Sequence, residues 1–263
     1  MKNPESKSPI ILLTNDDGFY SDGIEALFSR LDDLGQIYIV APDQEQSATS
    51  LSLTLHRPLR IKTIKTNIFA VSGTPADCIY LAVQEILPRK PDMIISGINH
   101  GPNLGLQDTS HSGTVAGATQ GTFLQLPSMA VSTMPDASGH FDFKFAADFT
   151  HRMAQHILKE GLPSRVTLNV NIPHPPIKGI KLAKLGEKRY NPEIVVKKDP
   201  RNRPYYWIGT GNPKEIGDKD SDVIVFKDGF ITITPLHSDS TDYAAMKSSL
   251  LKNIISRVNH ETF

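Results

Sequence analysis

The sequence predicts an α/β fold built around a mostly parallel sheet. Short apolar runs of strand length recur along the chain, beginning with PIILLT at 9–14 and IYIVAPD at 37–43. The segment between these two runs has apolar residues at helical spacing. A strand, a helix and a second strand in this order form a β-α-β unit, whose strands are parallel and whose crossover is right-handed.

The predicted helix of this unit presents one apolar face, formed by Ile24, Leu27, Phe28, Leu31 and Leu34. Asp22 with Glu25 resembles a capping box at the start of the helix, and Gly35 is a good stop signal. The next strand, at 37–43, ends in a loop.

Further elements continue the alternation of strands and helices. We expect two or three short strands within 51–72, a helix that begins at Thr74-Pro75-Ala76-Asp77 and ends near 87, a strand at 93–99, a helix at 113–124, a strand at 128–133, a helix at 143–161 and a strand at 166–173. The glycine-rich connection at 96–114 is long for a compact domain, and such loops are often functional.

The chain changes character after residue 177. Residues 178–236 are rich in Lys, Pro, Gly and Tyr, and DVIVFKDGFITIT is typical of a hairpin around Asp228-Gly229. An amphipathic helix is expected at about 242–258. We therefore divide the chain into a catalytic core, 1–177, and a carboxyl-terminal extension, 178–263, which packs on the core or on a neighbouring subunit.

Composition narrows the class of protein. Lysine plus arginine equals aspartate plus glutamate at 28 each, so no general attraction to a nucleic-acid duplex or a membrane is expected. The single cysteine, Cys78, cannot form an intramolecular disulfide. No signal peptide and no apolar run of membrane-spanning length is recognised. These features predict a soluble cytoplasmic protein.

Polar side chains follow three of the predicted parallel strands. Asp16 and Asp17 follow the first strand, Ser47 lies in the loop 42–50, and Asn99 follows the strand at 93–99. Because the carboxyl ends of parallel strands meet at one edge of a sheet, these loops can converge. Their oxygen atoms suit Mg²⁺ or Mn²⁺, and a divalent cation offsets the repulsion between the two aspartates. The alternative is that these residues are ordinary turn or cap residues.

Ser112-Gly113-Thr114 stands at a predicted helix start, where free backbone N–H groups and the helix dipole favour an anion. An ordinary N-cap is the alternative. A cation site facing an anion site indicates a phosphate substrate. His100 and His111 can reach a phosphate or lie in solvent, and Tyr205, Tyr206 and Trp207 can stack on a base or serve as packing residues. No P-loop, GxGxxG, GxSxG or HExxH motif is present.

Five stretches, in order along residues 11–122, resemble the SurE family of stationary-phase survival proteins, which are metal-dependent phosphatases of nucleoside 5′-monophosphates. They are LLTNDDGFYSDGI, VAPDQEQSATS, VSGTPADC, ISGINHGPNLG and HSGTVAGATQG, and ITPLHSDSTDY adds a weaker match. The family usually has Tyr where this chain has His111, and often an acidic residue at the position of Gln120.

The resemblance implies metal ligands at Asp16, Asp17, Ser47 and Asn99, the same four residues that the strand ends indicate. It also implies a Rossmann-like three-layer core, a short helix near 221–226, and a hairpin-and-helix extension exchanged between subunits of a homodimer or homotetramer. The cofactor would be one divalent ion, Mg²⁺, Mn²⁺ or Co²⁺.

The predicted reaction is hydrolysis of a phosphate monoester by a metal-activated water. Asp16 and Asp17 are the catalytic candidates, with Asp16 as the general base. Asn15 and Asn103 would orient the nucleotide, and Ser112, Gly113 and Thr114 would hold its phosphate. The family resemblance leaves activity on 3′-nucleotides and polyphosphate open.

Two other classes of protein compete with this prediction. A receiver domain also has an acidic pair after its first strand, but it needs a phosphoacceptor Asp after a later strand, where this chain has Ser96-Gly97-Ile98-Asn99. The other alternative is a sugar- or nucleotide-binding module without turnover. Steady hydrolysis of AMP or GMP would exclude both.

Overall fold

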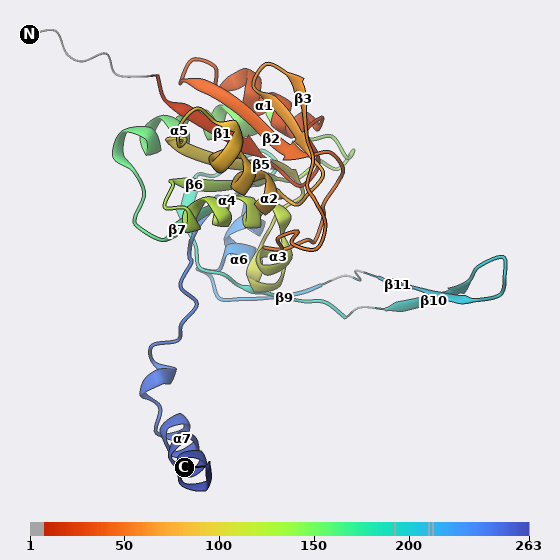
Figure 1. Cartoon of the computed structure of the whole chain (residues 1–263), viewed down its shortest axis with the longest axis vertical. Helices are drawn as coiled ribbons and strands as arrows, with labels where there is room; N and C mark the ends of the chain where they lie inside the picture. Colours follow the sequence, from red (N-terminus) through yellow and green to blue (C-terminus); the bar gives the residue numbers. More distant parts are fainter. Residues whose placement is uncertain (1–7, 192, 210, 212, 263) are drawn as a thin grey trace, which may run out of the picture.

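The structure is a computed structural model that describes residues 8–191, 193–209, 211 and 213–262. A sheet of nine strands forms its centre, and helices lie on both faces (Figure 1). In spatial order the strands are β3 (Ile61–Lys65), β4 (Ile68–Val71), β2 (Gln36–Pro42), β1 (Ile10–Thr14), β5 (Met93–His100), β6 (Ser128–Thr133), β7 (Val166–Ile172), β13 (Ile231–His237) and β8 (Ile180–Leu182).

Most neighbouring strands of this sheet are parallel. The antiparallel pairs are β3 with β4 and β7 with β13. The predicted α/β fold with a mostly parallel sheet is therefore confirmed.

Two layers of helices enclose the sheet. They are α1 (Asp22–Arg30) and α5 (Phe143–Glu160) on one face, and α2 (Pro75–Leu81), with its π-helical continuation Ala82–Ile86, and α4 (Gly113–Phe123) on the other. Ile11 and Leu13 of β1 belong to the apolar core under α1 and α5, whereas Ile10 and Leu12 face α2. Successive side chains of a strand point to opposite faces, so one short apolar run supplies both cores.

The carboxyl ends of β1, β2 and β5 lie at one edge of the sheet. Thr14, the last residue of β1, pairs with Ser96 of β5, and Pro42 ends the neighbouring β2. The pairing of β5 with β6 shifts its register between Ser96 and Asn99. This irregularity places Asn99 at the same edge as the loops that follow β1 and β2.

The first helix departs from its predicted ends. Its N-cap is Ser21 rather than a box formed by Asp22 and Glu25, and Ser21 makes no side-chain cap bond. The hydroxyl of Ser21 instead accepts a hydrogen bond from Asn15. The helix ends at Arg30, so Leu31, although buried, and Leu34 lie beyond it. The second helix starts at Thr74-Pro75-Ala76-Asp77 as predicted, and Thr74 and Asp77 form a capping box there.

Two connections differ from the expected pattern. The long segment after β5 contains a short helix, α3 (Gly105–His111), whose polar sequence GLQDTSH has no apolar face for periodicity to detect. Within 51–72, strands form only at β3 and β4, whereas 51–60 is irregular.

Two strands of the carboxyl-terminal extension form part of the central sheet. β13 pairs with β7, and β8 pairs with β13, so both strands belong to the nine-stranded sheet. The division of the chain into two domains at 177/178 remains a prediction. Part of the extension completes the sheet of the core.

The hairpin predicted around Asp228-Gly229 is wrong. Residues Asp222–Lys227 form a helix, α6, which Asp228 ends as its C-cap, and Gly229 then adopts a φ of 87°. Val223, Val225 and Phe226 are buried, so packing overrides the strand preference of their sequence. The short helix near 221–226 that the family resemblance implied is confirmed.

Two segments of the extension project from the body (Figure 1). One, called the arm here, is the antiparallel hairpin of β10 (Ile194–Lys198) and β11 (Pro204–Ile208). In the chain this hairpin lies between β9 (Glu187–Arg189) and β12 (Lys214–Ile216), which pair with each other. The other ends in α7 (Ser249–Thr262), which a 3₁₀ turn at Ala245–Lys247 precedes. The predicted helix at 242–258 therefore begins later and runs further. Within the described ranges, no helix has the length and apolar character needed to cross a membrane.

Candidate metal and phosphate site

Asp16 is fixed at the meeting point of three segments. Its carboxylate Oδ1 accepts a hydrogen bond from the hydroxyl of Thr114, in the first turn of α4. Its backbone carbonyl accepts a bond of 2.7 Å from the amide of Gln46, in the loop after β2. The side chain is buried. The loop after β1 is therefore tied both to α4 and to the loop after β2.

Burial raises the pKa of Asp16 to about 6, although the hydrogen bond from Thr114 acts in the opposite direction. The negative charge of Asp17 raises it further. A buried carboxylate beside a second carboxylate is costly to ionise unless a positive charge is close. The environment of Asp16 thus matches that of a cation ligand.

Asn15 and three small residues shape the loop that carries the aspartates. The side-chain amide of Asn15 donates to the carbonyl of Gly18, at 2.9 Å, and to the hydroxyl of Ser21, at 2.7 Å. A Cβ atom on Gly23 would lie 2.1 Å from the carbonyl oxygen of Ile98, so only glycine lets α1 start this close to β5. Asn15 holds the loop closed, and its own Oδ1 is buried with no hydrogen bond to a described residue.

Asp17 faces the end of β5. Its Oδ2 lies 3.0 Å from Nδ1 of His100, and its side chain is largely shielded from solvent. The carboxylate of Asp17 raises the pKa of His100 above its usual value, whereas partial burial of the ring lowers it. His100 therefore lies against Asp17 rather than free in solvent, and its contact with a phosphate remains a prediction.

Ser47 lies on the loop that Gln46 anchors to Asp16, but its side chain is exposed. Its hydroxyl donates to Oε1 of Glu45 at 2.6 Å. Ala48 and Ser50 both have a φ above 50°, which bends the loop sharply. Ser50 then bonds to the carbonyls of Ser110 and His111, at the end of α3. The loop is thus held by Asp16 before its turn and by the end of α3 after it. Ser47 remains a predicted ligand.

Asn99 is half-buried at the register shift of β5. Its amide nitrogen donates to the carbonyl of Gly101 at 2.7 Å, so the amide oxygen takes no part in that bond, and Asn99 remains a predicted ligand. It directly precedes His100, the residue that contacts Asp17. The structure thus brings the chain segments of all four predicted metal ligands to one edge of the sheet.

The start of α4 is packed against Asp16. Ser112 is the N-cap, and its hydroxyl accepts a hydrogen bond of 3.1 Å from the amide of Val115. A Cβ atom on Gly113 would approach Oδ2 of Asp16 to 2.9 Å, so glycine is required there. Of the two alternatives from the sequence, the structure shows the N-cap at Ser112. A role for Ser112, Gly113 and Thr114 in holding phosphate remains a prediction.

Asn103 lies in a buried polar network behind the site. Its backbone amide donates to Oδ1 of Asn171 at 2.7 Å, and its side-chain amide donates to the hydroxyl of Ser132 at 2.9 Å. Its carbonyl accepts from the side chains of Asn169 and Asn171. These bonds fix the chain between β5 and α3, whereas direct contact of Asn103 with substrate remains a prediction.

The residues at this edge fit a hard divalent cation. The buried oxygens Asn15 Oδ1, Asp17 Oδ2 and Ser96 Oγ form no hydrogen bond with described residues, and buried oxygens of this kind are suited to a cation or to water. In the part of the chain that the structure describes, no three side chains among His, Cys, Asp and Glu are grouped to hold a metal. A site here would therefore combine two carboxylates with neutral oxygens, which suits Mg²⁺ or Mn²⁺ better than zinc.

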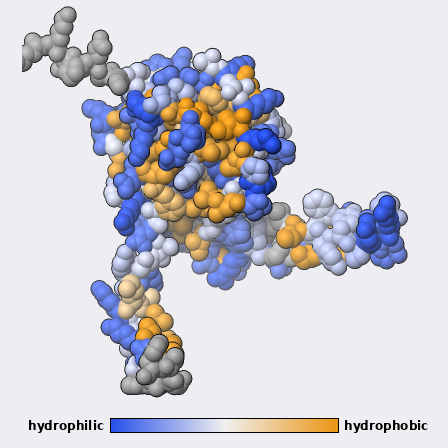
Figure 2. All heavy atoms as spheres, in the orientation of Figure 1, coloured by the Kyte–Doolittle hydropathy of each residue, from blue (hydrophilic) through white to orange (hydrophobic). Residues whose placement is uncertain are grey.

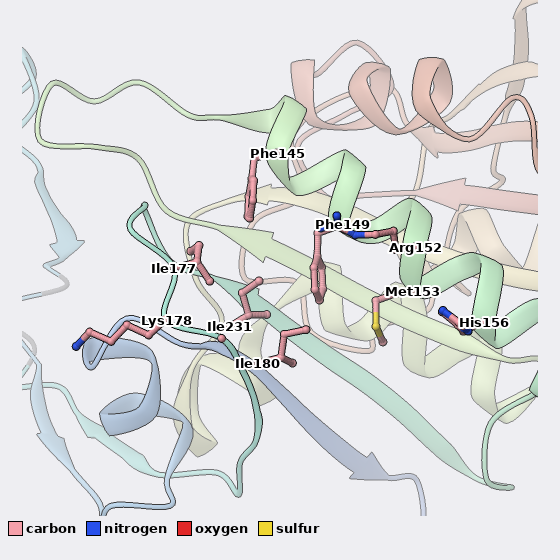
Figure 3. A pocket seen from close by; sticks show the side chains of 10 residues that line it. Phe145, Phe149, Arg152, Met153, His156, Ile177, Lys178, Ile180 and Ile231 are labelled. Carbon is pink, nitrogen blue, oxygen red and sulfur yellow. The ribbon is translucent and has the colours of Figure 1, made fainter.

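Other candidates lie away from this edge. Tyr205, Tyr206 and Trp207 are exposed on β11, in the arm that projects from the body, so they do not face the site of their own chain (Figure 1). The groove drawn in Figure 3, of about 460 Å³, lies between α5 and β8 and is lined by residues such as Phe149, Met153 and Ile180. None of the predicted site residues is among its lining residues.

Some supporting residues were missed by the sequence analysis. Asn169 and Asn171 alternate within the buried strand VTLNVNI, and polar residues at alternate positions of such a strand were an available signal. Phe141 and Phe143, which pack on His100, carried no such signal. Phe141 lies in an irregular segment, and Phe143 is the first residue of α5.

Comparisons with known proteins show which family the chain resembles. The family model described as Survival protein SurE matches residues 11–192. A protein of Syntrophotalea carbinolica named 5′-nucleotidase SurE is 43% identical over 238 residues, which cover 90% of this chain and 95% of that protein. A Moorella thermoacetica protein of the same name is 44% identical, with 89% and 92% covered. The crystal structure of a SurE protein from Aquifex aeolicus has a TM-score of 0.80 and 40% identity, and the match covers 93% of this chain and 100% of that one.

Proposed function

The chain belongs to the SurE family, and from this premise we propose that it is a divalent-metal-dependent phosphatase that converts nucleoside 5′-monophosphates to nucleosides and phosphate. Membership rests on the family match over residues 11–192 and on relatives, named 5′-nucleotidase SurE, that align over about nine-tenths of the chain. The shared fold extends to the Aquifex aeolicus protein.

The observation that carries this proposal is the position of Asp16 and Asp17. They lie between the loop after β2, the end of β5 and the first turn of α4. A cation held by Asp16, Asp17, Ser47 and Asn99 would therefore lie beside the helix terminus at Ser112–Thr114, which favours a phosphate. A cation next to an anion-binding terminus can stabilise the negative charge of a phosphoryl group during hydrolysis.

When bound, the metal supplies a Lewis acid for the phosphoryl oxygen and lowers the pKa of a coordinated water. The chain's own residues contribute position and proton transfer. Thr114 fixes the carboxylate of Asp16, which we assign as the group that takes the proton from the attacking water. The amides at the start of α4 would orient the phosphate. Asn15 closes the loop after β1, and Asn103 anchors the segment before α3. Both would thereby keep the backbone around the substrate in place.

We also propose that the chain acts as a homodimer or homotetramer in the cytoplasm. Exposed apolar side chains gather on the arm and on α7, including Val196 and Ile208 in the arm and Leu250, Ile254 and Ile255 in α7. Figure 2 shows apolar surface on both projections. Such surfaces are costly in water and mark interfaces. The single cysteine, Cys78, is buried, which suits a reducing compartment.

The test is steady-state hydrolysis of AMP and GMP with Mn²⁺, Mg²⁺ or Co²⁺, with release of phosphate as the readout. Many turnovers per chain, dependent on metal, are expected. A single stoichiometric phosphorylation or ligand binding without turnover would contradict the proposal and favour a receiver or a binding module. The same assay with 3′-nucleotides and polyphosphate defines the breadth of the substrate range.

A further inference from the structure

His100 occupies a defined place beside the acidic pair. Its Nδ1 lies 3.0 Å from Oδ2 of Asp17, and that oxygen is buried and forms no hydrogen bond with a described residue. The contact has the distance of an ion pair, and since a carboxylate oxygen can only accept, an N–H on Nδ1 would make it attractive. No other side chain among the described residues makes an ion pair with Asp17.

Two aromatic rings hold the imidazole in this position. The ring of His100 meets Phe141 edge-on at a centroid distance of 5.1 Å and Phe143 at 4.9 Å. The two phenyl rings are themselves stacked, 5.3 Å apart and 7° from parallel. Both edge-to-face contacts restrict rotation of the imidazole. The orientation of His100 is therefore set by a segment, 141–143, that contributes no metal ligand.

From this geometry we infer that His100 is a positioning residue: clamped by Phe141 and Phe143, it orients the carboxylate of Asp17 toward the cation. The inference rests on the proposed function, because it requires that Asp17 bind a metal. Groups that orient a ligating side chain in this way tune metal affinity without touching the metal. The imidazole is not itself a ligand in this account.

The variants that test this role differ in what they leave at position 100. His100→Ala removes the group, whereas His100→Asn keeps an N–H close to the place of Nδ1. Phe141→Ala keeps the histidine but loosens its clamp. His140→Ala is the matched control, because His140 is an exposed histidine that directly precedes this segment and touches Asp17 in no described contact.

The experiment measures the affinity of the metal-free protein for Mn²⁺ by calorimetry, alongside the melting temperature without metal. His100→Ala is expected to weaken Mn²⁺ binding roughly 10- to 100-fold, the usual loss when such an orienting partner is removed. His100→Asn should recover most of that loss, Phe141→Ala should show a smaller loss, and His140→Ala should bind as the unaltered chain does. The melting temperature should shift little, since His100 is partly exposed.

Two results would overturn the inference while leaving the proposed function intact. One is an unaltered Mn²⁺ affinity in His100→Ala, in a protein that still hydrolyses AMP. The other is a directly bonded nitrogen in the electron paramagnetic resonance spectrum of Mn²⁺ in the unaltered chain, which would make His100 a ligand. If the unaltered chain binds no Mn²⁺ at all, the proposed function and the inference both fail.

Discussion

The carboxyl edge of the sheet and the two projections of the extension depart from the usual placement of side chains in opposite ways. At the edge, polar groups are buried: Asn15 and Asp16 are almost inaccessible to solvent. On the projections, apolar groups are exposed: Ile208 in the arm is 77% exposed and Leu250 in α7 is 66% exposed. Buried polar oxygens are suited to a cation, and exposed apolar side chains are suited to another protein surface.

The comparison leads to the hypothesis that the two regions serve separable purposes. If the edge of the sheet binds metal and substrate, and the projections bind other copies of the chain, a change in one region should leave the property of the other intact. The predictions that follow test this separation, in order of their expected effect on turnover.

Removal of the metal should have the largest effect. Treatment with a chelator is expected to abolish hydrolysis of AMP, because the proposed mechanism depends on a cation held by Asp16, Asp17, Ser47 and Asn99. Added Mn²⁺ should restore activity. Sedimentation velocity on the same sample should show an unchanged assembly. Loss of assembly together with activity would show that the two regions are not separable.

Replacement of Asp16 should be almost as severe. Asp16→Asn keeps the shape of the side chain but removes its charge and its basicity, so kcat is expected to fall roughly 10²- to 10⁴-fold. Circular dichroism should show a retained fold. Asp43→Asn, which alters an exposed carboxylate at the start of the loop after β2, is the control for a general effect of charge. Turnover by Asp16→Asn at the rate of the unaltered chain would remove Asp16 from the mechanism.

The two ends of α4 allow a comparison within one helix. Gly113→Ala places a Cβ 2.7 Å from Cβ of Asp16, and the forced shift should lower kcat about 10- to 100-fold. Gly121→Ala at the far end would meet Oγ of Ser128 at 2.4 Å, which should cost about 1–3 kcal/mol of stability through overpacking. Below its melting temperature, Gly121→Ala should keep its kcat. Equal losses of kcat in both variants would argue against a special role for the start of α4.

Charges on α7 should change assembly far more than turnover. The double variant Leu251→Asp and Ile255→Asp introduces like charges on exposed apolar positions of one helix. The mass in solution, measured by light scattering, should fall, whereas kcat per chain should remain close to that of the unaltered protein. Lys252→Asp, on the same exposed helix, is the control. An unchanged mass would show that α7 is not an interface.

The smallest effect concerns stability. Folding raises the pKa of Asp16 to about 6, so the metal-free protein favours its protonated form. The stability cost of ionising it is absent below about pH 4, grows as the pH rises toward 6 and is complete above that. Asp16→Asn stays neutral, so metal-free Asp16→Asn should be more stable than the unaltered chain at pH 7 by on the order of 2–3 kcal/mol. Denaturant unfolding at pH 4 and pH 7 measures this difference, and an equal difference at both values would contradict it.

The sequence predicted the core well because its patterns are local. The run IILLT is buried on both faces and needs no partner information to be recognised as a strand, and Thr74 with Asp77 caps α2 as their spacing indicates. The convergence of the loops that carry Asp16, Gln46 and Asn99 followed from the rule for parallel strands.

The features that the sequence analysis missed depend on contacts between distant parts of the chain, which no local pattern encodes. The segment 222–227 has the composition of a strand, yet it forms α6, where Asp222 is buried and accepts bonds from the amides of Gly105 and Gly186. The hydroxyl of Ser21 makes no cap bond to α1 and instead accepts a hydrogen bond from the side chain of Asn15. The place of His100 depends on Phe141 and Phe143, which are about 40 residues away in the chain.

The central claim is that one cation binds where the loops after β1 and β2 meet the end of β5. A crystal structure of the protein with Mn²⁺, with anomalous scattering recorded at the manganese edge, tests it most directly. We predict a single strong anomalous peak within coordination distance of oxygen atoms of Asp16, Asp17, Ser47 and Asn99. A peak elsewhere in the molecule, or the absence of any peak at this edge of the sheet, would contradict the claim.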